Sequence, residues 1–394
     1  MNERRGAEPD EPGILQEYAS HFELFSGYLD FARFGPPSRD AAGCAAASVT
    51  SLARDPTGVD ALIPVAVCAR ALAAALTGRS GADSVALIPN TSTGIFQLAF
   101  ALKGGCVLVS PREFPANVYP WVQAARRGGA AIRWLRPPDG RVTPEAVSAA
   151  LAPEVTALAV SAVDFRTGYR ADLAALREVL GERLLLVDGI QGFGVADLPW
   201  DLADAVVSGG QKWLRAGWGS GFLSLSARAL DRLGGSLSGW SGAVYADRFD
   251  GVLHEAAPSA ARFSMSNPDL VAVAGLEAGL KLLASVGAAR IERAVAARVE
   301  ALLEVIAANG GGTLIPLSPA ERAGIIPLVL PGHDPMAVGA ALRAAGLTVS
   351  VRDEHVRLAP HATTRFAVAD KLDAALRSLT GRQRVAPTRT DRAS

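Results

Sequence analysis

The sequence is poor in the residues that build metal sites and disulfide frameworks. It has three cysteines and five histidines in 394 residues. Cys44, Cys68 and Cys106 stand in alanine-rich or apolar surroundings without CxxC spacing, which argues against a zinc site and against a disulfide framework. The histidines show no metal-ligand spacing, and we expect His355 and His361 to be solvated turn residues. We therefore expect a protein without a metal, in a reducing cytoplasm.

The sequence also has no excess of charge of one sign, and we find no long apolar run in it. The 39 basic residues balance 39 acidic ones, so the composition creates no field that would attract nucleic acid. We find no apolar run of membrane-spanning length, and no apolar stretch follows the polar start MNERRGAEPDEPG, so we expect neither a membrane anchor nor a signal peptide. Apolar residues still make up 49% of the chain, enough to bury a large core.

Short apolar runs alternate with amphipathic segments along most of the chain. Seven of them predict strands, at residues 84–88, 106–110, 130–135, 156–163, 183–188, 204–209 and 221–226. Helical patterns such as residues 171–180 separate several of these runs. This alternation predicts an α/β fold with a mostly parallel central sheet flanked by helices, whose ligands bind at the carboxyl ends of the strands.

The pattern changes after residue 267, where long helices at 270–287 and 289–309 lead into a smaller α/β unit. We expect a large ligand-binding domain over residues 51–275 and a small C-terminal domain over 276–380. Residues 13–50 are expected to pack on the small domain. The ends, 1–12 and 381–394, are polar and poor in apolar residues, so we expect disordered tails there.

Three features at the predicted strand ends can carry chemistry. Ser92, Thr93 and Gly94 open a helix, where hydroxyls, free amides and the helix dipole favour a phosphate; an ordinary Ser/Thr N-cap is the alternative. Asp188 either pairs with a cationic ring nitrogen or caps the next turn. Lys212, among glycines and tryptophans, is either a Schiff-base amine with a destabilised ammonium form or a surface lysine.

These three features follow one another along one edge of the predicted sheet. A phosphate-binding turn, a carboxylate for a ring nitrogen and a reactive amine are the partners that pyridoxal 5'-phosphate (PLP) needs for its phosphate, its pyridinium nitrogen and its aldehyde. We therefore predict an enzyme with PLP as cofactor.

Longer motifs resemble the class V aminotransferase family, which includes cysteine desulfurases, isopenicillin N epimerase-like proteins and kynureninases. DGIQGFG followed by SGGQKWLRAGWGSGFL is similar to the family's Asp-x-x-Gln and Ser-x-His-Lys signatures. YLDFARFGPPS, EFPANVYPW and ARFSMSNPD resemble further family segments, so the resemblance covers roughly residues 25 to 380. It implies PLP fold-type I, with a large domain around the sheet and a smaller α/β C-terminal domain.

The resemblance also implies roles for individual residues at the cofactor. Lys212 would form the Schiff base and move the Cα proton, and Asp188 would keep the pyridine nitrogen protonated. Gln191 would face the phenolic oxygen, and Phe114 would stack on the ring. The phosphate would be held by Ser92, Thr93 and Gln211, and by Asn267 from the neighbouring subunit of a homodimer.

Four further residues are expected to bind the substrate, a small amino acid: Arg357, Asn117, Arg166 and Trp240. Arg357 matches the arginine that binds the substrate carboxylate; a salt-bridged surface arginine is the alternative. Arg166 would otherwise pair with Asp164 or a loop carbonyl, and Trp240 would otherwise pack in the dimer interface.

Departures from the family pattern bear on the reaction. Phe114 stands where desulfurases carry a histidine, and it offers a ring face but no proton. Only DEHV separates Arg352 from Arg357, so the loop that holds the persulfide-forming cysteine of desulfurases is missing, which argues against persulfide transfer.

We therefore predict a lyase of secondary metabolism that acts on an S-substituted L-cysteine, by C–S β-elimination or by decarboxylation coupled to deamination. It would be similar to the sulfur-processing enzymes that tailor antibiotics such as lincosamides. An aminotransferase or epimerase of a small amino acid is one alternative. A non-catalytic relative that binds a partner protein is another.

Overall fold

The computed structural model of the chain describes residues 12–235 and 237–381. The tails expected over 1–12 and 381–394 therefore lie outside the described residues, apart from Pro12 and Gly381. The described helices are α1 Pro12–Ser20, α2 Arg39–Arg54, α3 Val59–Leu76, α4 Thr91–Ala101, α5 Tyr119–Arg126, α6 Pro144–Ala150, α7 Leu173–Leu180, α8 Ala227–Arg232, α9 Leu270–Val286, α10 Ala288–Ala308, α11 Pro335–Ala344 and α12 Val368–Thr380.

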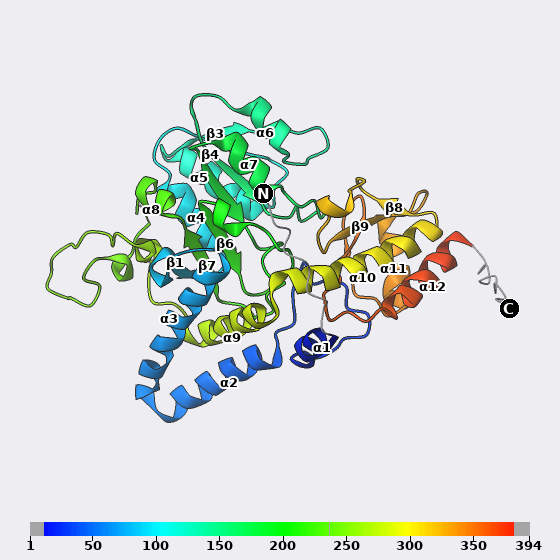
Figure 1. Cartoon of the computed structure of the whole chain (residues 1–394), viewed down its shortest axis with the longest axis horizontal. Helices are drawn as coiled ribbons and strands as arrows, with labels where there is room; N and C mark the ends of the chain where they lie inside the picture. Colours follow the sequence, from blue (N-terminus) through cyan, green and yellow to red (C-terminus); the bar gives the residue numbers. More distant parts are fainter. Residues whose placement is uncertain (1–11, 236, 382–394) are drawn as a thin grey trace, which may run out of the picture.

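A seven-stranded sheet forms the centre of the large unit (Figure 1). Its strand order is β1-β7-β6-β5-β4-β2-β3, and β7 alone runs antiparallel to its neighbours. All seven predicted strands are present, and the mostly parallel sheet is confirmed. Their bounds are β1 Val85–Ile88, β2 Cys106–Val109, β3 Ala131–Trp134, β4 Val155–Ser161, β5 Leu184–Asp188, β6 Ala205–Gly209 and β7 Gly221–Leu225.

Helices cover both faces of this sheet, which explains why its central strands, β4, β5 and β6, are mostly apolar. Along β5, Leu184 and Leu186 pack into the core beneath α4 and α5, whereas Leu185 and Val187 pack into the core beneath α3, α7 and α9. Successive side chains of a strand point to opposite faces, so a strand buried on both sides needs an unbroken apolar run.

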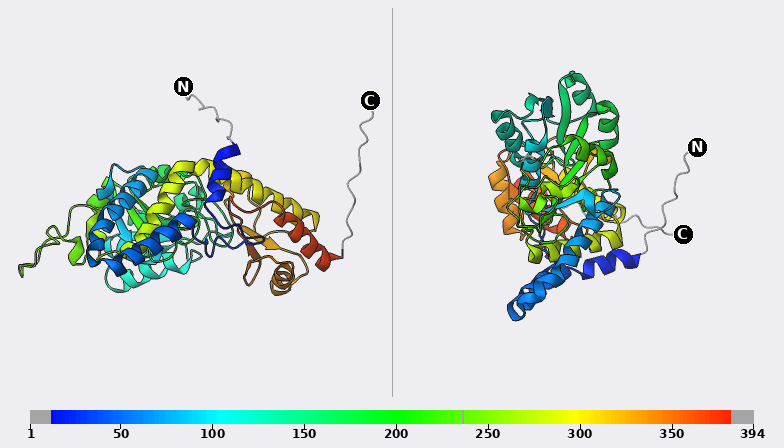
Figure 2. Two further views of the ribbon diagram at one scale, coloured as in Figure 1. Left: turned by 90° about the horizontal axis from the view of Figure 1, so that it is seen from below. Right: turned by 90° about the vertical axis from the view of Figure 1, so that its left-hand side faces the viewer.

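The small unit is built on a four-stranded antiparallel sheet in the order β10-β11-β9-β8. Its strands are β8 Gly312–Thr313, β9 Ile326–Val329, β10 Ser350–Val351 and β11 Val356–Leu358. Helix α10 runs along this sheet, and α11 and α12 pack together beside it (Figure 1). Figure 2 shows the small unit as an extension of the large one along the long axis of the molecule.

The N-terminal segment contacts both units. Leu29 donates its backbone N–H to Thr348 O (3.0 Å) and accepts from Ala359 N (2.7 Å), so this part of the chain joins the small unit. Helix α2, in contrast, packs along α9 beside the large unit. The boundary expected after residue 275 falls inside α9, and we propose to place it at Gly287, where α9 and α10 meet at an angle of 84°.

One helical segment corrects the expectation that no apolar run is long enough to span a membrane. Residues Pro56–Leu76, which include α3, are long and apolar enough by length and composition alone. Core helices of soluble proteins pass the same test, and α3 packs along α9 through buried alanines such as Ala69 and Ala73. Ile63 and Val67 of α3 remain exposed.

Candidate active site

The sequence-predicted residues come together at the carboxyl ends of the parallel strands. Asp188 ends β5 directly beside Ser161, the last residue of β4, in the register of the sheet. Lys212 follows β6, the next strand along, and Phe114 follows β2. The first turn of α4 begins three residues after β1. This edge is where ligands of such sheets bind, because the loops and helix N-termini converge there.

Asp188 is a buried carboxylate with one oxygen unused. Its Oδ1 accepts from the backbone N–H of Ile190 (3.0 Å), so it also caps the following turn. Its Oδ2 is buried and has no hydrogen-bond partner among the described residues. Burial raises the pKa of Asp188 to about 6, an effect that Lys212 only partly offsets. A buried carboxylate oxygen without a partner is costly, so this atom is suited to a cationic N–H donor.

Lys212 has an amine that loses its proton more easily than a surface lysine. Burial lowers the pKa of Lys212 to about 8, and Arg357 and Arg352 add to this shift, while Asp188 opposes it. The Nζ atom lies 5.6 Å from the ring centroid of Phe114. The alternative of an ordinary surface lysine is therefore not supported by its surroundings. An amine in this state is the nucleophile that a cofactor aldehyde requires.

The loop of Lys212 is held by the N-terminal segment. Gly35 donates its N–H to Gln211 O (2.9 Å). A Cβ at Gly35 would overlap the carbonyl oxygen of Lys212 and lie 2.9 Å from Arg215 Cγ, so only glycine fits this approach. Sequence reasoning missed Gly35, because its partner lies about 180 residues away in the chain.

Arg215 belongs to the same loop and holds it in place through side-chain contacts in the protein interior. Its φ of 54° is the one positive φ among the described non-glycine residues, a conformation that costs about 1 kcal/mol or more. The buried guanidinium donates to Pro36 O (2.7 Å) and Thr363 Oγ1 (3.1 Å), and its carbon lies 3.8 Å from the ring centroid of Phe22. The loop is thereby tied to the N-terminal segment and to the small unit. No signal in the sequence pointed to this role.

At the expected phosphate site, the residue that caps α4 differs from the prediction. Asn90, rather than Ser92 or Thr93, is the N-cap of α4, and its Oδ1 accepts from the N–H (3.0 Å) and the hydroxyl (3.2 Å) of Thr93. The Ser/Thr N-cap alternative is therefore wrong. The Thr93 hydroxyl is used inside the turn, whereas Thr91 Oγ1 is buried without a partner.

Gln211 lies close to the Thr91 hydroxyl at the expected phosphate site. A Cβ at Gly209 would overlap Gln211 Oε1 and lie 3.3 Å from Thr91 Oγ1, so the absence of a side chain at Gly209 leaves space between these two polar atoms. Thr91 was missed, although three hydroxyl residues in the run NTSTG gave a signal for it. Asn267 and Thr93 of the same chain line one neighbouring cavity of about 170 Å³.

Phe114 and Gln191, both predicted to contact the cofactor ring, have different surroundings. Phe114 is partly exposed beside Lys212, and it contacts Phe165 edge-on with ring centroids 5.2 Å apart. Gln191 is buried, with its amide nitrogen donating to Ala32 O (2.9 Å) and its oxygen accepting from Trp213 Nε1 (2.8 Å). One N–H of Gln191 thus remains for the phenolic oxygen of a ring.

Arg357 is not the surface arginine that one alternative proposed. It is 2% exposed, and all three residues of β11 are buried. Its Nη2 pairs with Asp30 Oδ1 (3.2 Å) and its Nη1 donates to Phe165 O (3.4 Å), while its Nε has no partner in the described part of the chain. Asp30 in turn accepts from Ser350 Oγ (2.8 Å).

The other expected substrate residues are placed less favourably. The buried Asn117 amide donates to Glu113 Oε2 (3.3 Å) and accepts from Trp121 Nε1 (3.3 Å), which leaves one N–H for the expected substrate contact. The Arg166 guanidinium pairs with Glu354 (3.1 Å), a partner that neither interpretation foresaw. Trp240 is exposed, and its ring centroid lies 6.4 Å from that of Phe249. The chain that follows projects from the large unit as a long loop (Figure 2).

His355 and His361 also differ from expectation, because both are buried rather than solvated. Burial lowers the pKa of His355 to about 4, helped by Arg166, Arg352 and Arg357, so the ring is neutral at pH 7. Within residues 12–235 and 237–381, both ring nitrogens of His355 are without a partner. His361 contacts Tyr18 and Thr363 in the cluster around Arg215.

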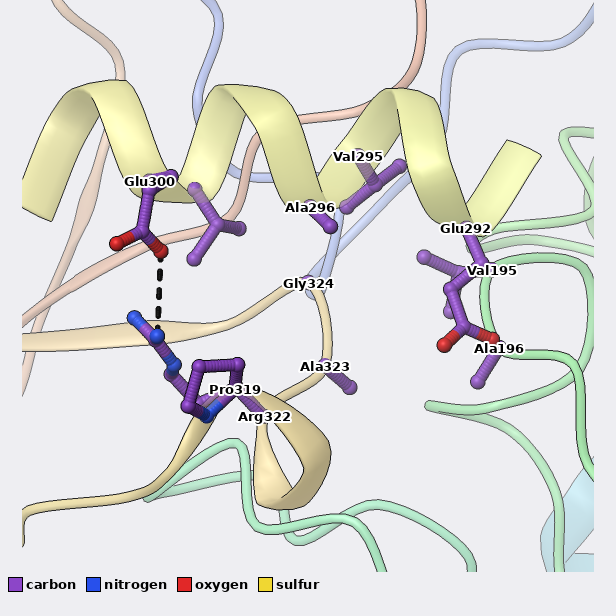
Figure 3. A pocket seen from close by; sticks show the side chains of 11 residues that line it. Val195, Ala196, Glu292, Val295, Ala296, Glu300, Pro319, Arg322, Ala323 and Gly324 are labelled. Carbon is purple, nitrogen blue, oxygen red and sulfur yellow. Dashed lines mark ion pairs between the residues drawn. The ribbon is translucent and has the colours of Figure 1, made fainter. Parts of the chain in front are cut away.

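The residues at this edge fit PLP. The unused oxygen of Asp188 suits a protonated ring nitrogen, the amine of Lys212 suits an aldehyde, and Phe114 offers a ring face. Thr91, Gln211 and the first turn of α4 offer donors for a phosphate. A separate cavity of about 70 Å³ beneath α10, lined by Glu292, Glu300 and Arg322, contains none of these residues (Figure 3).

Comparisons with known proteins identify relatives of the chain. The family model described as aminotransferase class V matches residues 66–369. The uncharacterised aminotransferase YcbU of Bacillus subtilis is 27% identical, over 71% of this chain and 74% of its own length. A probable cysteine desulfurase of Aeropyrum pernix is 30% identical, over 68% of this chain and 69% of its own length.

A solved structure shares the fold over nearly the whole chain. It is the cysteine desulfurase from Thermococcus onnurineus NA1, with a TM-score of 0.81 at 18% identity, and the match covers 93% of this chain and 98% of that one.

Proposed function

The chain belongs to the class V aminotransferase family and is a PLP-dependent enzyme, and from this premise we propose that it cleaves the C–S bond of an S-substituted L-cysteine by β-elimination. The products would be a thiol, pyruvate and ammonium, with one water consumed. The substrate would be a cysteine-like amino acid, in keeping with the cysteine desulfurases among the relatives.

One observation carries the choice of β-elimination over sulfur transfer to the protein. The β10–β11 hairpin closes through Arg352 N–H to His355 O (2.9 Å), so Asp353 and Glu354 alone form its turn. The three cysteines lie elsewhere, on α2, α3 and β2. Without a cysteine beside Lys212, the sulfur of a substrate has to depart with its substituent.

The residues of the site support this reaction through binding and proton transfer. When bound, PLP supplies a sink for the electrons left at Cα after proton removal. Lys212, with a pKa of about 8, would take the Cα proton as a general base. Asp188 would hold the proton on the ring nitrogen, and the free Nε of Arg357 would bind the α-carboxylate.

The test is the visible spectrum together with product analysis. The wild-type protein should show a cofactor band between about 400 and 430 nm that borohydride abolishes, and Lys212→Ala should lack it. With S-ethyl-L-cysteine the wild type should release pyruvate and ethanethiol in equal amounts. Carbon dioxide with ammonium would instead indicate decarboxylative deamination. A wild-type protein without a reducible band would contradict the whole proposal and revive the partner-binding alternative.

An aminotransferase or epimerase of a small amino acid is the second candidate. It is favoured by the likeness to an aminotransferase over 71% of the chain, and by the same Lys212 and Arg357, which these reactions also need. Restoration of the cofactor band by a keto acid after exposure to an amino acid would identify an aminotransferase. Deuterium uptake at Cα without a keto acid product would identify an epimerase.

We also propose a cytoplasmic homodimer that serves antibiotic biosynthesis. The projecting segment 240–253 supports the dimer, because Phe249 is 89% exposed and Leu253 is 99% exposed, and contiguous apolar side chains of this kind mark interfaces. Trp240 and the turn with Asn267 would then face the neighbouring subunit. Light scattering in solution tests this proposal, and a monomeric mass would contradict it.

A further inference from the structure

The β10–β11 hairpin carries four polar residues on one face. Ser350 lies opposite Arg357 in the register of the two strands, and the hydrogen bond from Arg352 N to His355 O continues the pairing by one step. Because side chains alternate along a strand, Ser350 and Arg352 share a face with His355 and Arg357. The contact between Arg357 Nη2 and Ser350 Oγ (3.4 Å) agrees with this assignment.

This hairpin face lies beside Lys212. Asp30 and the Phe165 carbonyl contact Arg357, and the Phe165 ring contacts Phe114, which lies over the amine of Lys212. The charges of Arg352 and Arg357 both lower the pKa of Lys212, which agrees with their position near the amine.

The acidic groups around this face are used by other partners. Asp30 is occupied by Arg357 and Ser350, and Glu354 pairs with Arg166. The guanidinium of Arg352, within the described parts of the chain, has neither a hydrogen bond nor an ion pair. The face therefore holds an excess of donors.

Three groups on the face have unused polar atoms. They are the Arg357 Nε, the guanidinium of Arg352 and both ring nitrogens of His355, which is 2% exposed. Buried polar groups without partners, here Arg357 Nε and the His355 ring, are costly, so they favour a ligand that brings acceptor oxygens. Arg352 is exposed at the rim of the face and adds a positive charge there. One α-carboxylate bound by Arg357 would leave Arg352 and His355 still without acceptors.

We propose that Arg352 and His355 form a subsite for a second acidic group, so that the substrate carries a carboxylate on its sulfur substituent as well as at Cα. This inference rests on the proposed function and defines the class of substrate for the same site. The α-carboxylate would lie at Arg357, and the side chain would extend along the hairpin face toward its turn.

The first test compares two substrates that differ in charge and hardly in shape. S-carboxymethyl-L-cysteine should be cleaved with a kcat/KM roughly tenfold or more above that of S-carbamoylmethyl-L-cysteine, since a hydrogen bond to a charged group contributes about that factor. Arg352→Gln should abolish the preference by raising KM for the acid but not for the amide, with any change of kcat the same for both substrates. Arg352→Lys should retain part of it, because the charge is kept.

Arg33→Gln is the matched control. Arg33 is an exposed arginine on the N-terminal segment, close enough to Arg357 to affect its pKa, but it is not on the hairpin face. Arg33→Gln should keep the preference for the acid. Equal kcat/KM for the two substrates in the wild type, or an equal loss in Arg33→Gln and Arg352→Gln, would overturn the subsite.

A binding measurement separates the subsite from the reaction. Glutarate and its monoamide have no amino group to react, so their binding to the holoenzyme can be measured by calorimetry. Glutarate should bind roughly tenfold more tightly to the wild type and to Arg33→Gln, but no more tightly to Arg352→Gln. Equal or undetectable binding of both ligands would overturn the inference. Failure of C–S cleavage with a preference for glutarate would overturn only the proposed reaction.

Discussion

At the residue scale, the site depends on two ionisable groups whose surroundings oppose their charged forms. Asp188 and Lys212 are both removed from water, which raises the pKa of the carboxyl to about 6 and lowers that of the amine to about 8. Such paired pKa shifts are typical of groups that transfer or hold protons, because they bring the pKa of each group closer to neutral pH.

The first prediction concerns Asp188→Asn. A carboxyl whose pKa rises from 3.8 to about 6 on folding costs about 3 kcal/mol when it is ionised. Cofactor-free Asp188→Asn should therefore be more stable than the wild type at pH 8, by up to this amount. The difference should shrink as the pH falls from about 6 to 4, since the folded wild type then binds the proton first. Urea unfolding at several pH values measures it.

The same substitution should lower kcat of the holoenzyme roughly 100-fold or more, because a neutral amide cannot hold the ring nitrogen in its charged form. Asp231→Asn, at an exposed aspartate of α8, serves as the control and should change neither property by much. A variant that gains stability but keeps full activity would contradict the role of Asp188.

The second prediction concerns the pH dependence of cofactor attachment. The neutral amine is the attacking form, and the pKa of Lys212 is lowered to about 8. The rate at which the cofactor-free protein regains its visible band on addition of PLP should rise up to about pH 8 and level off above it. A rate that keeps rising toward pH 10 would mean that the amine has the pKa of a solvated lysine.

At the element scale, the loop after β6 is shaped by contacts with segments that are remote in the chain. Gly35 approaches the Lys212 carbonyl from the N-terminal segment, and Arg215 reaches Pro36 and Thr363. The loop owes its conformation to these contacts, since Arg215 adopts a positive φ that is unfavourable by itself.

The third prediction follows from that approach. Gly35→Ala should destabilise the protein by about 1–3 kcal/mol and weaken PLP retention, because the added Cβ overlaps the Lys212 carbonyl. Gly43→Ala is the matched control, since it lies in α2 with nothing within 4 Å of an added Cβ. That substitution should stabilise the helix by up to about 1 kcal/mol. Thermal unfolding and the cofactor absorbance after dialysis distinguish the two variants.

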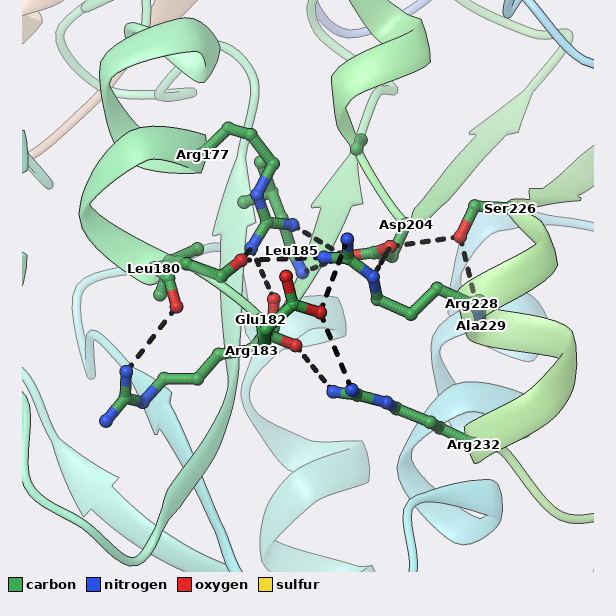
Figure 4. Close-up of polar contacts among 12 residues, drawn as sticks. Arg177, Leu180, Glu182, Arg183, Leu185, Asp204, Ser226, Arg228, Ala229 and Arg232 are labelled. Carbon is green, nitrogen blue, oxygen red and sulfur yellow. Dashed lines mark hydrogen bonds and ion pairs between the residues drawn. The ribbon is translucent and has the colours of Figure 1, made fainter.

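At the scale of the whole molecule, stability and chemistry are placed at opposite edges of the large sheet. The site occupies the carboxyl ends of β4, β5 and β6, whereas Asp204 lies just before β6 and next to the start of β5 (Figure 4). Its side chain is buried and accepts from Arg177 Nη1 (2.7 Å), from Leu185 N (2.9 Å) and from Ser226 Oγ (3.0 Å). This network joins α7, β5 and α8.

The fourth prediction is that Asp204→Asn separates stability from activity. Removing one partner of a buried ion pair leaves Arg177 uncompensated, which costs about 3–5 kcal/mol. The variant should unfold at a lower urea concentration than the wild type, while kcat and KM of the folded enzyme stay unchanged. Asp201→Asn, at an exposed position nearby, should leave both unchanged. A large loss of kcat in folded Asp204→Asn would show that the two edges are coupled.

Much of the fold and part of the site could be predicted from the sequence, because they depend on patterns of residues that are close together in the chain. The strands of the large sheet follow from apolar runs, most of them buried on both faces, although the edge strand β3 is largely exposed. Asp188 and Lys212 could be proposed from their positions at the ends of such strands, whereas Phe114 was expected from the family resemblance. Asn90, in contrast, replaced Ser92 and Thr93 as the cap of α4, because competition among four adjacent polar side chains is decided by backbone geometry.

Contacts between distant segments were decided by the tertiary structure alone. Arg357 is buried on Asp30 across more than 300 residues of chain, and Asn117 turns inward to Glu113 and Trp121. The hairpin face with Arg352 and His355 forms because β10 pairs with β11, and the N-terminal segment pairs with Thr348 and Ala359, which flank the two strands. Periodicity and motif order are local properties that a sequence displays directly. The partner of a buried polar group depends on how the whole chain packs, and for this protein that packing determined which residues remain free to meet a substrate.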